Sequence, residues 1–103
     1  MPPYQVEQPQ LSDIAALAGI TALDFGTDWC GWCKAAAPLI EAAVAAAAVR
    51  HIKVEDGSGR KLGRAFRVKL WPTLVVLRDG VEVARVVRPA DLGAVSAALA
   101  AAA

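Results

Sequence analysis

Two cysteines separated by two residues stand where a short apolar segment meets a long segment of helix-forming residues. The junction reads Trp29-Cys30-Gly31-Trp32-Cys33-Lys34. The apolar residues 21–26 before it predict a strand, and residues 31–49 predict a helix that Pro38 kinks. A disulfide between such close cysteines closes too small a loop to stabilise a domain by restricting its unfolded state. The pair therefore indicates chemistry rather than a structural crosslink.

The rest of the chain alternates predicted helices and strands. Residues 11–18 place apolar side chains on one helix face, with Gly19 positioned to end that helix. Asp79-Gly80 predicts a hairpin turn between two strands. Further strands are expected at 51–55, 73–77 and 81–87, and further helices at 60–67 and from Pro89 to the end of the chain.

This order predicts an α/β fold with a mixed central sheet of four to five strands and helices on both faces. Its core is expected in the apolar runs 20–25, 52–54 and 70–77. Residues 11–103 are expected to form a single domain, since 103 residues leave little room for a second one. Residues 1–10 are expected to form an N-terminal arm, or at most a short edge strand at 4–6, to which the sequence assigns no chemistry.

Charge and hydropathy restrict the partners and the compartment. A net charge of +1 argues against a nucleic-acid-binding protein. No apolar run approaches the ~18 residues of a membrane span, and residues 1–10 are too polar and proline-rich for a signal peptide. We therefore expect a cytoplasmic monomer without membrane contact, or a periplasmic protein if a signal peptide has been removed.

The position of the cysteines assigns them different roles. The start of a helix offers unpaired N–H groups and the positive end of the helix dipole, which favour the thiolate form of Cys30 and make it the expected nucleophile. Cys33 lies one helical turn further on, more shielded from solvent, as a resolving thiol would. Two inert cysteines are one alternative. A zinc site is another, although with His51 as the single histidine it would need carboxylate ligands.

The sequence contains no Gly-rich dinucleotide fingerprint and no phosphate-binding loop. Reducing equivalents are therefore expected to arrive by thiol exchange. We expect no cofactor apart from a redox-active Cys30–Cys33 disulfide and no bound metal.

The chain resembles the thioredoxin family from Leu11 onward. The matching motifs, in the family's order and near its spacings, are Leu23-Asp24-Phe25, Trp29-Cys30-Gly31-x-Cys33-Lys34, Pro38, Lys53, Trp71-Pro72-Thr73 and Asp79-Gly80. The resemblance implies a thioredoxin-like fold. It also implies that Cys30 attacks a disulfide in a partner protein and that Cys33 releases the product.

Asp24 interrupts an apolar strand six positions before Cys30. Burying a carboxylate costs free energy unless it finds a partner or its pKa rises. Asp24 therefore either faces water at the strand end or is a buried group with a chemical role. The resemblance implies a general acid/base that takes the proton of Cys33. By strand alternation alone Lys53 is a solvated side chain, whereas the resemblance implies a partner of Asp24.

The resemblance also implies a docking surface for the substrate. The peptide bond before Pro72 would be cis, and the backbone just before it would pair with the substrate strand. Trp71 would then line a groove with Trp29 and Trp32, although core packing is an equal alternative for Trp29. The full set of expected substrate-binding residues is Trp29, Gly31, Trp32, Trp71, Pro72 and Thr73.

Three positions depart from the family's pattern. Trp32 replaces a proline, and its backbone N–H is expected to stabilise the Cys30 thiolate and raise the redox potential. Gly26 replaces a common tryptophan. Arg88 replaces a glycine and is expected to restrict which partners fit.

The combined interpretation is a thiol-disulfide oxidoreductase that reduces protein disulfides and is regenerated by a reductase or another dithiol protein. One alternative is a more oxidising or exported protein with the same chemistry. Another is a non-catalytic binding module with the same fold.

Overall fold

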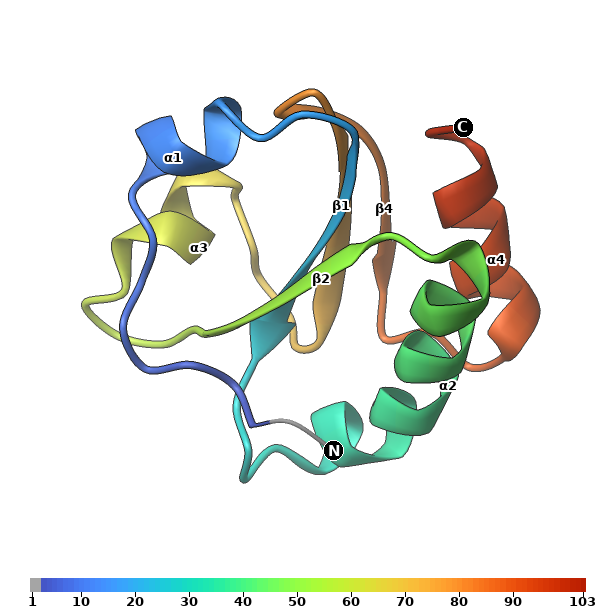
Figure 1. Cartoon of the computed structure of the whole chain (residues 1–103). Helices are drawn as coiled ribbons and strands as arrows, with labels where there is room; N and C mark the ends of the chain where they lie inside the picture. The colour runs from blue at the N-terminus through green and yellow to red at the C-terminus, as the bar shows by residue number, and fades with distance from the viewer. Residues whose placement is uncertain (1–2) are drawn as a thin grey trace.

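A four-stranded mixed sheet lies at the centre of the computed structural model, in which residues 3–103 are described (Figure 1). The strands are β1 (Ile20–Gly26), β2 (Arg50–Glu55), β3 (Thr73–Arg78) and β4 (Val81–Val87). Their order across the sheet is β2-β1-β3-β4, with β1 parallel to β2 and antiparallel to β3, and β3 antiparallel to β4. The predicted mixed sheet is confirmed, with four strands.

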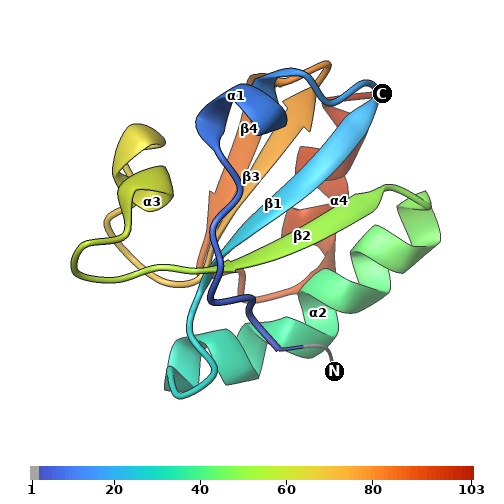
Figure 2. The ribbon, with the colours of Figure 1, turned by 60° about the vertical axis from the view of Figure 1, so that its left-hand side comes forward.

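Helices cover both faces of this sheet. One face carries the short helices α1 (Leu11–Ala15) and α3 (Lys61–Ala65), and the other carries α2 (Gly31–Ala47) and α4 (Leu92–Ala100) (Figure 2). Alternate side chains of β1 enter separate cores, since Leu23 and Phe25 pack with residues of α1 and α3 while Ala22 packs with residues of α2 and α4. No helix in residues 3–103 is long and apolar enough to cross a lipid bilayer.

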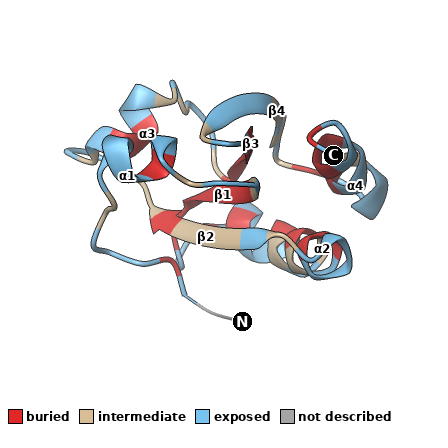
Figure 3. Ribbon diagram, turned by 45° about the horizontal axis from the view of Figure 1, so that its top comes forward, coloured by how far each residue is buried: buried red, intermediate tan, exposed pale blue. Residues whose placement is uncertain are grey.

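Burial follows the position of each strand in the sheet. The central strands β1 and β3 are buried on both faces, as the continuous apolar run of β3 predicted (Figure 3). The edge strand β4 is exposed or half-buried along its whole length. The end of β1 that leads into α2 is therefore buried, and the cysteines follow it at the start of α2.

Several helix boundaries differ from the predicted ones. Helix α1 ends at Ala15, before Gly19, and α3 is confined to Lys61–Ala65. Helix α2 ends at Ala47, because Ala48 adopts the left-handed conformation with φ 55°. Pro89 does not open α4. That helix begins after Asp91, whose side chain accepts a hydrogen bond from the N–H of Ala94 at 2.8 Å.

The N-terminal arm runs beside β2 and forms one bridge to it. The N–H of Gln5 donates to the carbonyl of Lys53 at 2.9 Å, and the N–H of Glu55 donates to the carbonyl of Gln5 at 3.0 Å, which pairs Gln5 with Val54 in parallel. Tyr4, next to this bridge, is only 6% exposed. The arm thus carries an aromatic side chain into the interior at the end of the sheet where the cysteines lie.

Candidate active site

Cys30 and Cys33 occupy the first turn of α2. Cys30 is the N-cap residue of this helix, and its sulfur accepts a hydrogen bond from the backbone N–H of Cys33 at 3.3 Å. Both are free thiols, and Cys33 is the more buried, with 2% exposure against 8% for Cys30. The strand-to-helix placement and the greater shielding of Cys33 are as the sequence predicted. Across residues 3–103, no group of three or more His, Cys, Asp or Glu side chains is placed to hold a metal ion.

The thiol of Cys33 is held in its protonated form. Burial, and after it the hydrogen bond with Cys30, together raise the pKa of Cys33 to about 12. At neutral pH this thiol is therefore a poor nucleophile, because the thiolate is the reactive species. Any reaction at Cys33 requires a nearby group that accepts its proton.

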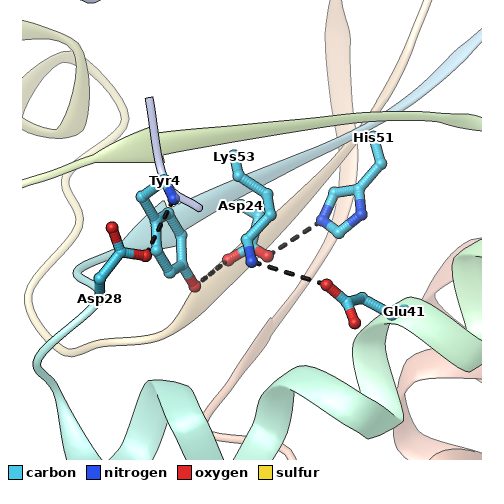
Figure 4. Close-up of polar contacts among 6 residues, drawn as sticks. All are labelled: Tyr4, Asp24, Asp28, Glu41, His51 and Lys53. Atoms are coloured by element: carbon cyan, nitrogen blue, oxygen red, sulfur yellow. Dashed lines mark hydrogen bonds and ion pairs between the residues drawn. The ribbon is translucent and has the colours of Figure 1, made fainter. Parts of the chain in front are cut away.

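A buried carboxylate lies in the same part of the interior. Asp24 is 2% exposed, so it does not face water. Its Oδ1 accepts a hydrogen bond of 2.7 Å from the hydroxyl of Tyr4, and its Oδ2 lies 3.0 Å from Nε2 of His51 (Figure 4). The tyrosine and the histidine approach Asp24 from opposite sides, one from the N-terminal arm and one from β2. Both oxygens of the carboxylate thus have hydrogen-bonding partners.

Lys53 is the Cα partner of Asp24 in the parallel pairing of β1 and β2. Its side chain is only 9% exposed, so its interpretation as a solvated side chain is wrong. The ammonium lies 3.6 Å from Oε1 of Glu41 and 4.6 Å from the centroid of the Tyr4 ring. The implied pairing of Lys53 with Asp24 stays a prediction.

Tyr4 is the residue of this site that the sequence did not reveal. Its side chain packs with both cysteines in one buried cluster, against which Trp71 lies. The only signal was a single aromatic residue in an otherwise polar, proline-rich arm. Nothing in that local pattern indicates that the side chain of Tyr4 reaches a carboxylate twenty residues further along the chain.

Gly26 provides the space that Tyr4 occupies. A Cβ atom on Gly26 would lie 2.7 Å from the sulfur of Cys33 and 2.7 Å from both Cζ and the hydroxyl oxygen of Tyr4. A larger residue at this position would therefore displace one of the two side chains. The buried position of Tyr4 therefore depends on the absence of a side chain at residue 26.

Tryptophans surround the cysteines on the outside. Trp29 is 71% exposed and Trp32 is 59% exposed, so core packing is wrong for Trp29. The rings of Trp29 and Trp71 meet edge to face with centroids 5.7 Å apart. Trp71 is half-buried, and its indole N–H donates to Oδ2 of Asp56 at 2.8 Å. The exposed rings of Trp29 and Trp32 and the half-buried ring of Trp71 thus offer apolar surface beside the cysteines.

The peptide bond between Trp71 and Pro72 is cis. Pro72 and Thr73 are both buried, and the hydroxyl of Thr73 donates to the carbonyl of Leu70 at 2.6 Å. The side chain of Thr73 therefore holds the turn that leads into β3 and does not reach the surface. Gly31, by contrast, is exposed as the first residue of α2.

Arg88 extends over this surface from the end of β4. Its Nε donates to the carbonyl of Trp71 at 2.8 Å, and its guanidinium lies 4.6 Å from the centroid of the Trp32 ring. Its backbone has φ 47°, a left-handed conformation that favours glycine. Arg88 thus connects Trp71, the residue before Pro72, with Trp32, one of the two residues between the cysteines.

The backbone of Trp32 does not contact the sulfur of Cys30 in the way the sequence suggested. The N–H that donates to this sulfur belongs to Cys33. A proline at position 32 would leave that donor in place. The geometry therefore removes the reason for expecting Trp32 to raise the redox potential through its own N–H.

Comparison with known proteins identifies the relatives of this chain. Residues 7–101 match the family model described as Thioredoxin. The chain is 36% identical over 83 residues to a thioredoxin from Chlamydia trachomatis, covering 78% of each chain. It is 31% identical over 80 residues to a thioredoxin from Mycolicibacterium smegmatis, covering 74% of this chain and 71% of the relative.

Solved structures give the same relationship. The reduced form of thioredoxin 2 from Pseudomonas aeruginosa PAO1 superimposes with a TM-score of 0.83 at 53% identity, covering 94% of this chain and 91% of that one. A mutant thioredoxin from Halobacterium salinarum superimposes with a TM-score of 0.76 at 29% identity, covering 93% and 85% of the two chains.

Proposed function

The chain belongs to the thioredoxin family of dithiol–disulfide oxidoreductases, and we propose that it works as a reductant of protein disulfides, with Cys30 as the nucleophile and Cys33 as the resolving thiol. The observation that supports these roles best is the pairing of an N-cap cysteine with a buried, protonated cysteine one turn away. The first is placed to attack, and the second is placed to react only after the first has done so.

The first step takes place at Cys30. Its thiolate attacks one sulfur of the substrate disulfide, forms a mixed disulfide and expels the other substrate sulfur as a thiolate. The N–H of Cys33 and the positive end of the α2 dipole stabilise the negative charge on Cys30 before the attack. The exposed Trp29 and Trp32 beside the cysteines offer apolar contact to the incoming chain.

The second step takes place at Cys33. Its sulfur attacks the sulfur of Cys30, the mixed disulfide breaks, and the remaining substrate sulfur leaves with the bonding electrons. The product is an oxidised chain with a Cys30–Cys33 disulfide and a substrate with two reduced sulfurs. Because the thiol of Cys33 must lose its proton for this attack, we assign the role of proton acceptor to the buried carboxylate of Asp24.

The substrate is proposed to bind along the edge formed by Trp71 and Pro72. An extended segment would pair with the backbone of Trp71, a form of strand addition. Arg88 already donates to the carbonyl of Trp71, so a substrate that uses this acceptor competes with the guanidinium for it. This contact is a physical reason for Arg88 to restrict which partners fit.

Regeneration then requires two electrons from outside the chain. We propose that a reductase or another dithiol protein supplies them by thiol exchange, without a bound cofactor, and that the chain acts as a monomer. A reducing role would suit the cytoplasm, where thiols are kept reduced.

Insulin reduction with dithiothreitol tests the catalytic role directly. The intact chain is expected to accelerate the precipitation of insulin B chain above the dithiothreitol background, and Cys30→Ser is expected to remove the acceleration. Equal activity of the two proteins would contradict the catalytic role of Cys30 and favour the alternative of a non-catalytic binding module with this fold.

The redox potential tests the direction of electron flow. Equilibration with glutathione buffers, followed by alkylation of the free thiols, gives the potential of the Cys30–Cys33 pair. A reductant is expected near the ~−270 mV of thioredoxin. A value near the ~−120 mV of a periplasmic oxidant would favour the oxidising alternative.

A further inference from the structure

We propose that Tyr4 is a catalytic residue of this chain, whose hydroxyl passes the proton of Cys33 to Asp24 in the resolving step. The inference rests on the proposed function, because it concerns the second step of that reaction. It assigns a chemical role to the N-terminal arm, which the sequence treated as a loose segment.

The hydroxyl of Tyr4 stands between the donor and the acceptor of the proton. It donates a hydrogen bond of 2.7 Å to Oδ1 of Asp24, and the bond is buried. The same oxygen and the sulfur of Cys33 both lie 2.7 Å from the position that a Cβ on Gly26 would occupy, so they face one small space. The side chains of Cys33 and Tyr4 also make a hydrogen-bonding contact, which lowers the pKa of Cys33 against the effect of burial.

Tyr4 is held in this position from several sides. Its backbone N–H donates to Oδ1 of Asp28 at 3.0 Å, and the adjacent Gln5 is bridged to β2. The ammonium of Lys53 lies over its ring at 4.6 Å from the centroid. A side chain with these restraints can serve as a fixed relay, which a mobile arm could not.

The proton balance of the step is simple. As the sulfur of Cys33 attacks Cys30, its proton moves to the hydroxyl oxygen of Tyr4, and the hydroxyl's own proton moves to Oδ1 of Asp24. Tyr4 is neutral before and after the transfer. Burial and the negative charge of Asp24 raise the pKa of Tyr4 far above its usual range, so it acts as a relay and not as a base.

The proton also has a route back to solvent. A pocket of about 190 Å³ is lined by Tyr4, Cys33 and Lys53, together with residues of the arm and of α2. This volume is large enough for water molecules. Once the product has left, water in this pocket can take up, through the hydroxyl of Tyr4, the proton that the relay has placed on Asp24.

A purely structural role for Tyr4 is the competing explanation, because its ring fills the space beside Gly26. Tyr4→Phe separates the two roles, since it keeps the ring and removes only the hydroxyl. The measurement is the rate at which the mixed disulfide between Cys30 and a small aromatic disulfide is resolved, followed by acid quench and mass spectrometry from pH 6 to pH 10.

The relay predicts a specific change in this rate. At pH 7, Tyr4→Phe is expected to slow resolution about tenfold or more, so that the mixed disulfide accumulates. The defect is expected to shrink towards pH 10, because hydroxide then takes the proton of Cys33 without the relay. In a Cys33→Ser background, which lacks the resolving thiol, Tyr4→Phe is expected to alter the first step far less.

Three outcomes are informative. Resolution by Tyr4→Phe at the wild-type rate, with the wild-type pH profile, would overturn the relay. An equal slowing of both steps at every pH would also overturn it, because it would show a structural defect. A Cys33→Ser chain that forms no mixed disulfide at Cys30 would instead overturn the proposed function, and the relay with it.

Discussion

Nε2 of His51 lies 3.0 Å from Oδ2 of Asp24, a carboxylate with 2% exposure. Removing this partner leaves one oxygen of a buried carboxylate without its donor, which is costly. We therefore expect His51→Leu to lower the free energy of unfolding by about 1–3 kcal/mol. Urea denaturation of the reduced protein measures the change.

Two controls separate this contact from general packing. His51→Gln, which keeps an N–H donor, is expected to recover part of the loss. In an Asp24→Asn background, which lacks the buried charge, His51→Leu is expected to cost less. An equal cost in both backgrounds would show that His51 stabilises the fold by some other contact.

The raised pKa of Cys33 makes stability depend on pH in alkaline solution. In the unfolded chain the thiol ionises near pH ~8.5, whereas in the folded chain it keeps its proton until about pH 12. Between these values the unfolded state is favoured by ionisation, so the free energy of unfolding falls by up to about 1.4 kcal/mol per pH unit. Thermal unfolding of the reduced protein at pH 7, 9 and 10.5 follows this loss.

Cys33→Ala provides the comparison, since other titrating groups remain in both proteins. The variant is expected to lose less stability than the wild type over the same pH interval. Parallel losses in the two proteins would mean that the thiol of Cys33 is not held protonated by the fold.

Gly26 is predicted to be intolerant of even one added carbon. In Gly26→Ala the new Cβ would lie 2.7 Å from Cys33 and from Tyr4, so one of them must move. We expect a loss of about 1–3 kcal/mol of stability together with slower disulfide exchange. Urea denaturation and the insulin assay measure both effects.

Gly31→Ala is the matched control, because a Cβ at Gly31 has no atom within 4 Å. Its stability is expected to be unchanged or to rise by up to about 1 kcal/mol, since alanine is the better helix former. Similar losses in the two variants would contradict the packing of Tyr4 beside Gly26.

Arg88 is predicted to compete with protein substrates for the carbonyl of Trp71. Arg88→Gly removes this hydrogen bond and suits the backbone φ of 47°. A hydrogen bond with a net value of about 1 kcal/mol corresponds to about a fivefold change in affinity, so KM for insulin is expected to fall by about that factor. Steady-state kinetics over a range of insulin concentrations measures KM.

Arg88→Lys distinguishes charge from the contact itself. Lysine keeps the positive charge but lacks the Nε–H that reaches Trp71, so its KM is expected to lie between those of the wild type and Arg88→Gly. A higher KM for Arg88→Gly would show that Arg88 binds the substrate rather than competing with it.

The elements around the cysteines were predictable because the signals are local. The apolar run of β1, the helix formers of α2 and the Asp79-Gly80 turn each specify structure within a few residues. The start of α4 was not, because capping by Asp91 outweighed the preference of Pro89 for a helix start.

The site was predictable only in part, because only some of its residues lie close together in the sequence. Cys30, Cys33 and Asp24 lie within ten residues of one another, and their order along the chain already indicates a common location. Tyr4 and His51 reach Asp24 through contacts across twenty or more residues, which periodicity cannot reveal. Lys53 was misjudged on alternation alone, because α2 and the arm cover the face of β2 that would otherwise meet solvent.

The most direct test of the account traps the intermediate of the proposed reaction. Reduced Cys33→Ser is mixed with a protein disulfide, quenched with acid and mapped by peptide mass spectrometry. A mixed disulfide at Cys30 is the expected result, with no adduct at Cys33 when Cys30→Ser is treated in the same way. Absence of the adduct at Cys30, or an adduct that forms at Cys33 as fast in Cys30→Ser, would contradict the assignment of nucleophile and resolving thiol.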